Sequence, residues 1–142
     1  MGHMDYSAQM RDLGLRVTRG RLAVLDVLDA NPHSSAEKVV EHVHRALPDV
    51  SIQSVYNVLN DLTDQGMLRR FTPPHSAALY ETRVNDNHHH AICTSCGRIE
   101  DVECAVGHAP CLTPSENHGM EIQIADVLYQ GVCEDCRKSG AA

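Results

Sequence analysis

No long apolar run is present in the sequence, since none exceeds five residues. A helix that crosses a bilayer needs about 20 consecutive apolar residues. The N-terminus also lacks the basic, apolar and small-residue order of a secretory signal. We therefore expect a soluble, cytoplasmic protein that has no membrane partner.

The chain also lacks an excess of basic residues, which at first argues against nucleic acid because phosphate attracts a positive surface. Its 12 Lys+Arg and 19 Asp+Glu give a net charge of −7. The imbalance is uneven: residues 1–84 have a net charge of −1 and residues 85–142 have a net charge of −6. Basic residues gather near the start, at Arg11, Arg16, Arg19 and Arg21. A chain of 142 residues accommodates one ordinary domain or two small ones, and this split indicates two regions, the first able to carry a local basic face.

Cysteine and histidine are abundant, with 6 Cys and 10 His. Without an export signal the cysteines are expected to be reduced, which favours metal binding over disulfides. Cys93, Cys96, Cys133 and Cys136 form two C-x2-C pairs, and two such turns supply the four sulfur ligands of a closed structural zinc site. Redox thiols or an iron centre of rubredoxin type are the alternatives.

Apolar periodicity and capping residues predict a run of short helices in the first region, at about residues 6–13, 18–29, 36–47 and 51–65. The expected N-caps are Thr18, Ser34 in a capping box with Glu37, and Ser51. Residues 67–72 and 77–82 predict a two-stranded hairpin. Helices followed by a hairpin are the order of a winged helix-turn-helix.

The helix at residues 51–65 is the expected recognition helix. Its buried stripe is predicted to be Ile52, Val55, Leu59 and Leu62. Its outward residues are hydrogen-bonding groups suited to base edges and phosphates. They equally describe a solvated helix face. We expect DNA contacts from Arg16, Thr18, Arg19, Gln53, Ser54, Tyr56 and Asn57.

The second region follows a polar connector at residues 84–87. Strands are predicted at residues 88–92, 98–102 and 121–129, the last with a break near Asp126, and a short helical turn is predicted at residues 115–118.

A run of three histidines opens the first of these strands. Alternation along a strand places His88 and His90 on one side, which makes either a two-nitrogen chelate or a polar strand edge. Asp101 and Glu81 offer carboxylates for a mixed site suited to Fe(II), Mn(II) or Zn(II).

Several motifs together resemble the ferric uptake regulator superfamily over residues 6–136. They are Val17-Thr18-Arg19, Ser51-x3-Val55-Tyr56, His88-His89-His90-Ala91-Ile92-Cys93-x2-Cys96-Gly97 and Cys133-x2-Cys136. The resemblance implies an α+β protein with a winged helix-turn-helix DNA-binding domain at 1–82, a hinge at 83–87, and an α/β dimerisation and metal-binding domain at 88–142. It implies a homodimeric, metal-dependent repressor of operator DNA and not an enzyme. Within the family the chain looks most like the actinobacterial peroxide-responsive regulators of catalase genes.

The resemblance also implies which residues bind the regulatory Fe(II) or Mn(II). They are His33, Glu81, His88, His90 and Asp101. Asp101 is similar to the aspartate of peroxide sensors, in which oxidation of a histidine ligand, here His33 or His90, releases the metal and the DNA. Glu81 is instead similar to ordinary iron sensors, so an iron- or zinc-availability sensor is the first alternative. A C-x-x-C thiol redox protein is the alternative from another class.

Two further cysteines, Cys104 and Cys111, have His108 and His118 nearby in the sequence. They are interpreted as a thiol switch, a second metal site or two ordinary free cysteines. The family's additional metal site is not expected, because positions 87 and 125 are Asn87 and Ala125.

Overall fold

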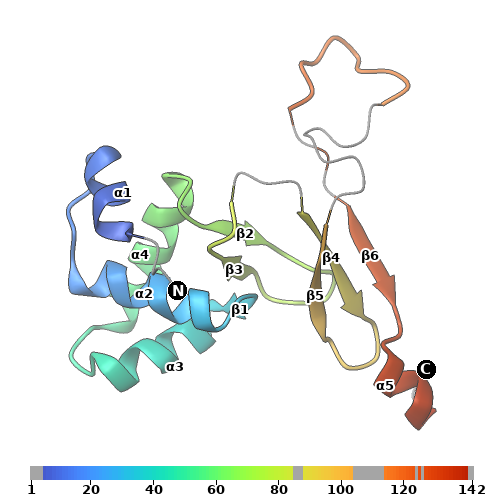
Figure 1. Cartoon of the computed structure of the whole chain (residues 1–142), viewed down its shortest axis with the longest axis horizontal. Helices are drawn as coiled ribbons and strands as arrows, with labels where there is room; N and C mark the ends of the chain where they lie inside the picture. The colour runs from blue at the N-terminus through green and yellow to red at the C-terminus, as the bar shows by residue number, and fades with distance from the viewer. Residues whose placement is uncertain (1–4, 85–87, 104–113, 124, 126, 141–142) are drawn as a thin grey trace. The chain divides into compact units, whose positions relative to one another are not determined.

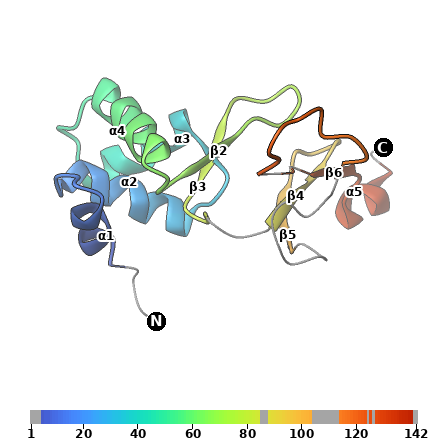
Figure 2. The same cartoon turned by 90° about the horizontal axis from the view of Figure 1, so that it is seen from above.

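The computed structural model describes residues 5–84, 88–103, 114–123, 125 and 127–140. The chain separates into two compact units, residues 1–84 and 85–142. Figure 1 shows the helices α1 to α4 with strands β1 to β3 in the first unit, and strands β4 to β6 with α5 in the second; Figure 2 shows the two units from above. Among the described residues, no helix combines the length and apolarity needed to cross a bilayer.

The N-terminal unit consists of four helices and a small sheet. The helices are α1 (Tyr6–Asp12), α2 (Arg19–Ala30), α3 (Ala36–Ala46) and α4 (Ile52–Asp64). The strands are β1 (Ser34–Ser35), β2 (Arg69–Phe71) and β3 (Leu79–Glu81). They pair antiparallel in the order β1-β3-β2. The predicted two-stranded hairpin is therefore one part of a three-stranded sheet, because the loop before α3 adds the short β1.

Two of the three predicted helix caps are confirmed. The Thr18 hydroxyl accepts a hydrogen bond from the Arg21 N–H, and the Ser51 hydroxyl accepts one from the Ser54 N–H. The prediction of Ser34 as the cap of α3 was wrong, since the neighbouring Ser35 caps this helix. Ser34 is instead paired with Tyr80 in the sheet.

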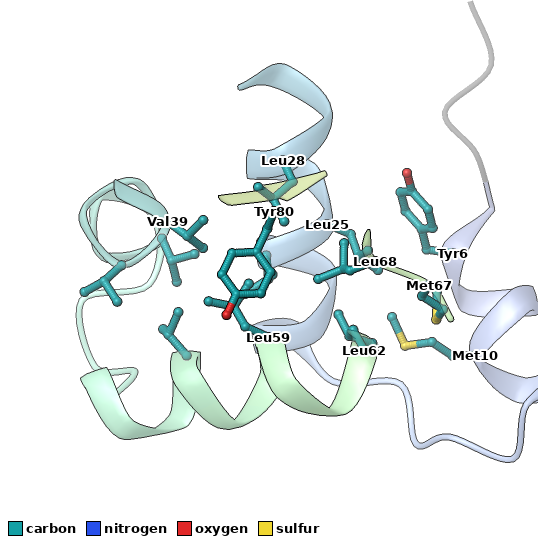
Figure 3. Close-up of a cluster of buried hydrophobic side chains, with 14 residues drawn as sticks. Tyr6, Met10, Leu25, Leu28, Val39, Leu59, Leu62, Met67, Leu68 and Tyr80 are labelled. Atoms are coloured by element: carbon teal, nitrogen blue, oxygen red, sulfur yellow. The ribbon is translucent and has the colours of Figure 1, made fainter. Parts of the chain in front are cut away.

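The core of this unit lies between the helices and β3. Leu25 and Leu28 of α2 and Leu59 and Leu62 of α4 are fully buried, and Figure 3 shows Tyr80 of β3 among them. Each fully buried leucine contributes roughly 1.5–3 kcal/mol to folding.

One residue of the predicted α4 stripe is outside this core. Ile52 was expected to be buried but is 58% exposed, because it lies in the first turn of α4, directly after the cap. The inward stripe of the helix therefore begins at Val55.

The C-terminal unit is a three-stranded sheet followed by a short helix. Its elements are β4 (His88–Cys93), β5 (Ile99–Glu103), β6 (Leu128–Gly131) and α5 (Glu134–Ser139). The order is β5-β4-β6, with β4 antiparallel to β5 and parallel to β6. The α+β fold class is thus confirmed.

Two predictions in this unit need correction, and one helix was missed. The strand expected at 121–129 is limited to β6. In the parallel register Leu128 lies opposite His90, so residues 121–123 fall before the position opposite His88, where β4 begins, and have no partner on that strand. The turn expected at 115–118 is not helical, because His118 and Gly119 have φ values of 53° and 78°. The helix α5 was not predicted, since its 6 residues include none that is buried.

Candidate metal centres and DNA-contact surface

Parallel pairing of β6 with β4 brings the two C-x2-C motifs together. Cys93 ends β4 and lies opposite Gly131 of β6 in the strand register. The chain turns through Cys96 after β4, whereas after β6 it enters α5, with Cys133 as the N-cap. Two motifs separated by some 40 positions in sequence therefore occupy the same end of the sheet.

The four cysteines have the spacing that a tetrahedral ion requires. Their sulfur atoms all lie within 4.8 Å of one another, and Cys96 Sγ is 3.8 Å from Cys133 Sγ. Sulfurs at about 2.3 Å from a tetrahedral zinc are separated by about 3.8 Å. The residues thus fit Zn(II), and four protein ligands leave no open position for catalysis.

The backbone at this cage favours the thiolate form of Cys93. The Cys133 and Cys96 N–H groups donate to Cys93 Sγ at 3.3 and 3.5 Å. These hydrogen bonds lower the pKa of Cys93 to about 6. The Cys133 side chain and burial raise the pKa of Cys136 to about 12. The surroundings thus favour a thiolate at Cys93 and a protonated thiol at Cys136. A bound cation would stabilise the thiolate form of the other cysteines as well.

The N-terminal unit brings together two of the five predicted regulatory ligands. His33 Nε2 is 3.2 Å from Glu81 Oε2, and the Glu81 side chain in β3 is buried. His33 has a φ of 62°, which is uncommon for a residue other than glycine. Its N–H donates to the Tyr80 carbonyl at 3.1 Å, and this bond holds the loop against β3. Such held backbone conformations cluster at functional sites.

The C-terminal unit brings together the other three. His88 and His90 lie two residues apart on β4, and their ring centroids are 5.0 Å apart. Asp101 of β5 pairs with His90 of β4, and its Oδ1 is 3.5 Å from His90 Nε2 and 3.8 Å from His88 Nε2. Two imidazoles and a carboxylate are donors suited to Fe(II), Mn(II) or Zn(II).

The predicted DNA-contact residues lie along the first turns of α4 and around the start of α2. Gln53, Ser54, Tyr56 and Asn57 are exposed. The Gln53 side-chain amide donates to Asn57 Oδ1 at 2.9 Å, which aligns two amides on one helix face. Arg16 and Arg19 are also exposed, whereas the Thr18 hydroxyl is occupied as the cap of α2.

Sequence reasoning missed a role for Arg21, although the arginine-rich start includes it. Its guanidinium donates to the Arg16 carbonyl and lies 3.7 Å from Asp61 Oδ2 of α4. Arg21 therefore connects the segment that contains Arg16 to α4, the predicted recognition helix. Thr18, Arg21, Ser54 and Asn57 line a depression between these elements.

Two of the predicted site residues are not placed. Cys104 and Cys111, together with His108, lie outside the described residues. His118 is described, and it lies in an exposed turn where its N–H donates to the Glu116 carboxylate.

A family model described as the ferric uptake regulator family matches residues 12–129. The chain belongs to the ferric uptake regulator family. It is 53% identical over 132 residues to the transcriptional regulator FurA of Mycobacterium tuberculosis, covering 93% of this chain and 90% of that one. It is 52% identical over 126 residues to ferric uptake regulation protein 1 of Mycolicibacterium fortuitum, covering 89% and 78% of the two chains.

The fold agrees with solved structures of ferric uptake regulators. That of Helicobacter pylori superposes with a TM-score of 0.68 at 22% identity and covers 93% of this chain and 89% of that one. Membership in the ferric uptake regulator family makes the protein a metal-dependent transcriptional regulator and not an enzyme. The alternative interpretation as a C-x-x-C thiol redox protein was therefore wrong. The paired cysteines belong to a transcriptional regulator, in which their four side chains lie together.

Proposed function

We propose that the protein is a homodimeric repressor that binds double-stranded operator DNA when Fe(II) or Mn(II) occupies a regulatory site. The ligands of this site are His33, Glu81, His88, His90 and Asp101. Zn(II) in the four-cysteine cage would have a structural role, because these cysteines come from the end of β4 and from the chain that follows β6.

The observation that carries this proposal is the pair of preformed donor groups, one in each unit. His33 and Glu81 are in contact in the N-terminal unit, and Asp101 lies against two histidines in the C-terminal unit. Each group alone supplies too few ligands for a closed site. One ion that takes ligands from both groups would restrict the angle between the units.

That restriction would control DNA binding through geometry. A dimer must place its two recognition helices about one helical turn of DNA apart, roughly 34–36 Å. The ion favours the DNA-binding arrangement only to the extent that it binds this arrangement more tightly than the others. A differential of about 3 kcal/mol changes the operator affinity about 100-fold.

We further propose that hydrogen peroxide is the signal that releases the DNA. A ferrous ion held by these residues would supply the redox chemistry that activates peroxide. Overall, an imidazole C–H of His33 or His90 gains one oxygen atom from hydrogen peroxide, and water leaves. The modified ring is a poorer ligand, so metal and DNA are released. Asp101 supports this assignment, because it resembles the aspartate of peroxide sensors and lies against His90.

Mass spectrometry of the Fe(II)-loaded protein after micromolar peroxide tests this proposal. We expect +16 Da on His33 or His90 together with loss of operator binding, and no change in the Mn(II)-loaded protein. Unmodified histidines with retained DNA binding would contradict peroxide sensing.

Glu81 favours a second candidate, an iron-availability sensor without peroxide chemistry. It resembles the glutamate of ordinary iron sensors, and the relatives carry the names FurA and ferric uptake regulation protein. In that case operator binding would follow the free Fe(II) concentration and would be insensitive to micromolar peroxide. Operator binding that follows the free Zn(II) concentration instead of the free Fe(II) concentration would indicate a zinc sensor.

A further inference from the structure

A basic residue lies beside the carboxylate of the N-terminal donor pair. Strands β2 and β3 pair so that Arg69 is directly opposite Glu81. Arg69 Nε is 3.9 Å from Glu81 Oε1, whereas the other oxygen, Oε2, is 3.2 Å from His33 Nε2. The two oxygens of one carboxylate therefore have different neighbours, a guanidinium on one side and an imidazole on the other.

The burial of Glu81 makes its neighbours energetically important. Its side chain is 1% exposed, and that of Arg69 is 26% exposed. A carboxylate removed from water is unfavourable unless a positive charge compensates it. Because a guanidinium stays protonated at all physiological pH values, Arg69 supplies positive charge to Glu81 in the metal-free protein.

A divalent ion on Glu81 would supply the same compensation and would meet the charge of Arg69. Like charges a few ångströms apart repel one another, most strongly where water is excluded. Arg69 therefore stabilises the metal-free state and destabilises the metal-bound state. We propose that Arg69 lowers the affinity of the regulatory site for divalent cations and so sets the metal concentration at which the repressor is loaded. This inference rests on the proposed role of Glu81 as a ligand.

The neighbouring arginine provides a matched control. Arg70 is exposed and pairs with Tyr80, so its side chain projects from the opposite face of β2. Arg69→Met and Arg70→Met change the net charge of the chain equally, and only the first removes the charge beside Glu81. Arg69→Lys keeps a positive charge with a different shape.

The experiment is a titration of the zinc-loaded full chain with Mn(II), in which free Mn(II) is measured by electron paramagnetic resonance. We expect Arg69→Met to bind Mn(II) about tenfold more tightly than the wild type. Arg70→Met and Arg69→Lys should stay within about threefold of the wild type. The gain should shrink in 0.5 M salt, because salt screens a partly exposed charge.

Two outcomes would overturn the inference. One is equal affinity of the Arg69→Met and Arg70→Met proteins, and the other is weaker binding by Arg69→Met, which would make Arg69 an orienting group. Glu81→Gln separates this inference from the proposed function. If Glu81→Gln leaves Mn(II) affinity unchanged, Glu81 is not a ligand and both fail. If it weakens binding and the two methionine variants are alike, only the role of Arg69 fails.

Discussion

A hydrogen-bonded residue, Asp29, connects three segments of the N-terminal unit. Tyr6 Oη donates to both oxygens of the Asp29 carboxylate, at 2.7 and 2.8 Å. Thr82 Oγ1 donates to Oδ1 at 2.7 Å. Burial, followed by the hydrogen bond to Asp29, raises the pKa of Tyr6 well above its ordinary value, so the phenol keeps its proton. Asp29 thus joins α1, the end of α2 and the residue after β3.

Removing one hydroxyl tests the strength of this connection. Tyr6→Phe should lower the free energy of unfolding of the N-terminal unit by about 1–2 kcal/mol, because a hydrogen bond to a charged group is lost. Urea unfolding followed by circular dichroism measures the change. Tyr56→Phe removes a hydroxyl from an exposed tyrosine of α4 and should change stability by less than about 0.5 kcal/mol. Equal effects of the two substitutions would show that the Tyr6 hydrogen bonds contribute nothing specific.

The ionisation of Cys93 gives the four-cysteine cage, the proposed zinc site, a defined dependence on pH. The folded protein lowers the pKa of this thiol from its ordinary value near 9 to about 6. A lowered pKa contributes stability that is present in full above the unfolded value and is lost as pH falls through the folded value. Zinc favours the thiolate further.

In the metal-free protein, the stability that the Cys93 thiolate contributes to the C-terminal unit should therefore be complete above about pH 9 and shrink as the pH falls to about 6. Bound zinc should move this loss to lower pH, and zinc should be released together with the folding of the unit. The zinc content after dialysis at each pH, with circular dichroism of the same samples, measures both. Zinc content and folding that stay unchanged from pH 9 to pH 4 would contradict the thiolate assignment. The Cys93→Ser protein should lack zinc at every pH.

At the scale of elements, the first turns of α4 carry the proposed DNA-reading surface. The N-terminal part of a recognition helix is the part that reaches base edges. Gln53 lies there and holds Asn57 through its amide. Gln65 is the C-cap of the same helix and is also exposed.

The two glutamines form a matched pair of substitutions. Gln53→Ala should weaken operator binding about tenfold, since a contact to a base edge is worth roughly 1–3 kcal/mol. Gln65→Ala should leave it within about twofold. Fluorescence anisotropy with operator DNA measures both, and equal affinities of the two variants would exclude Gln53 from the interface. Neither substitution removes a buried side chain, so both proteins should remain folded.

Elements that bury an apolar stripe were predictable from the sequence, and those held by other means were not. The helices α2 and α4 combine a side-chain cap with buried leucines, and both signals are local. The helix α5 buries nothing and has no side-chain cap, and the four-cysteine cluster adjoins it. Strand β1 has 2 residues, and it exists only because β3 lies beside it.

The same distinction applies to the sites. Spacing alone indicated the cage, because each C-x2-C pair is local in the sequence. His33 has no such neighbour: it follows Asn31-Pro32 and reaches Glu81 only through the packing of its loop on β3. Its proposed role as a metal ligand follows from the family resemblance. Arg69 was overlooked because strand register, which places it opposite Glu81, is not visible in composition or spacing.

At the scale of the whole molecule, the charge distribution limits how the protein can bind DNA. Residues 1–84 have a net charge of −1 and residues 85–142 have a net charge of −6. Long-range attraction to phosphate is therefore weak, and exposed Arg16 and Arg19 are the predicted cationic contacts. If a dimer makes about four arginine contacts to phosphate, the logarithm of the operator association constant should fall with log[salt] at a slope of about −4. This dependence is shallower than that of strongly basic DNA-binding proteins.

Because the protein attracts DNA phosphates only weakly, the proposed metal-dependent spacing of its recognition helices should decide whether it binds operator DNA. This metal dependence should persist at low salt. Protein that keeps its zinc but lacks the regulatory ion should bind operator DNA at least about 50-fold more weakly than the Mn(II)-loaded form, even at 50 mM salt, because a few phosphate contacts cannot replace two correctly spaced recognition helices. Anisotropy titrations of both forms at several salt concentrations measure the gap and the slope. His90→Ala, which leaves the four-cysteine cage complete, should behave like the metal-free form when Mn(II) is present. Operator binding by the metal-free protein within about threefold of the loaded form would mean that the recognition helices are already spaced for DNA and that the ion has another role.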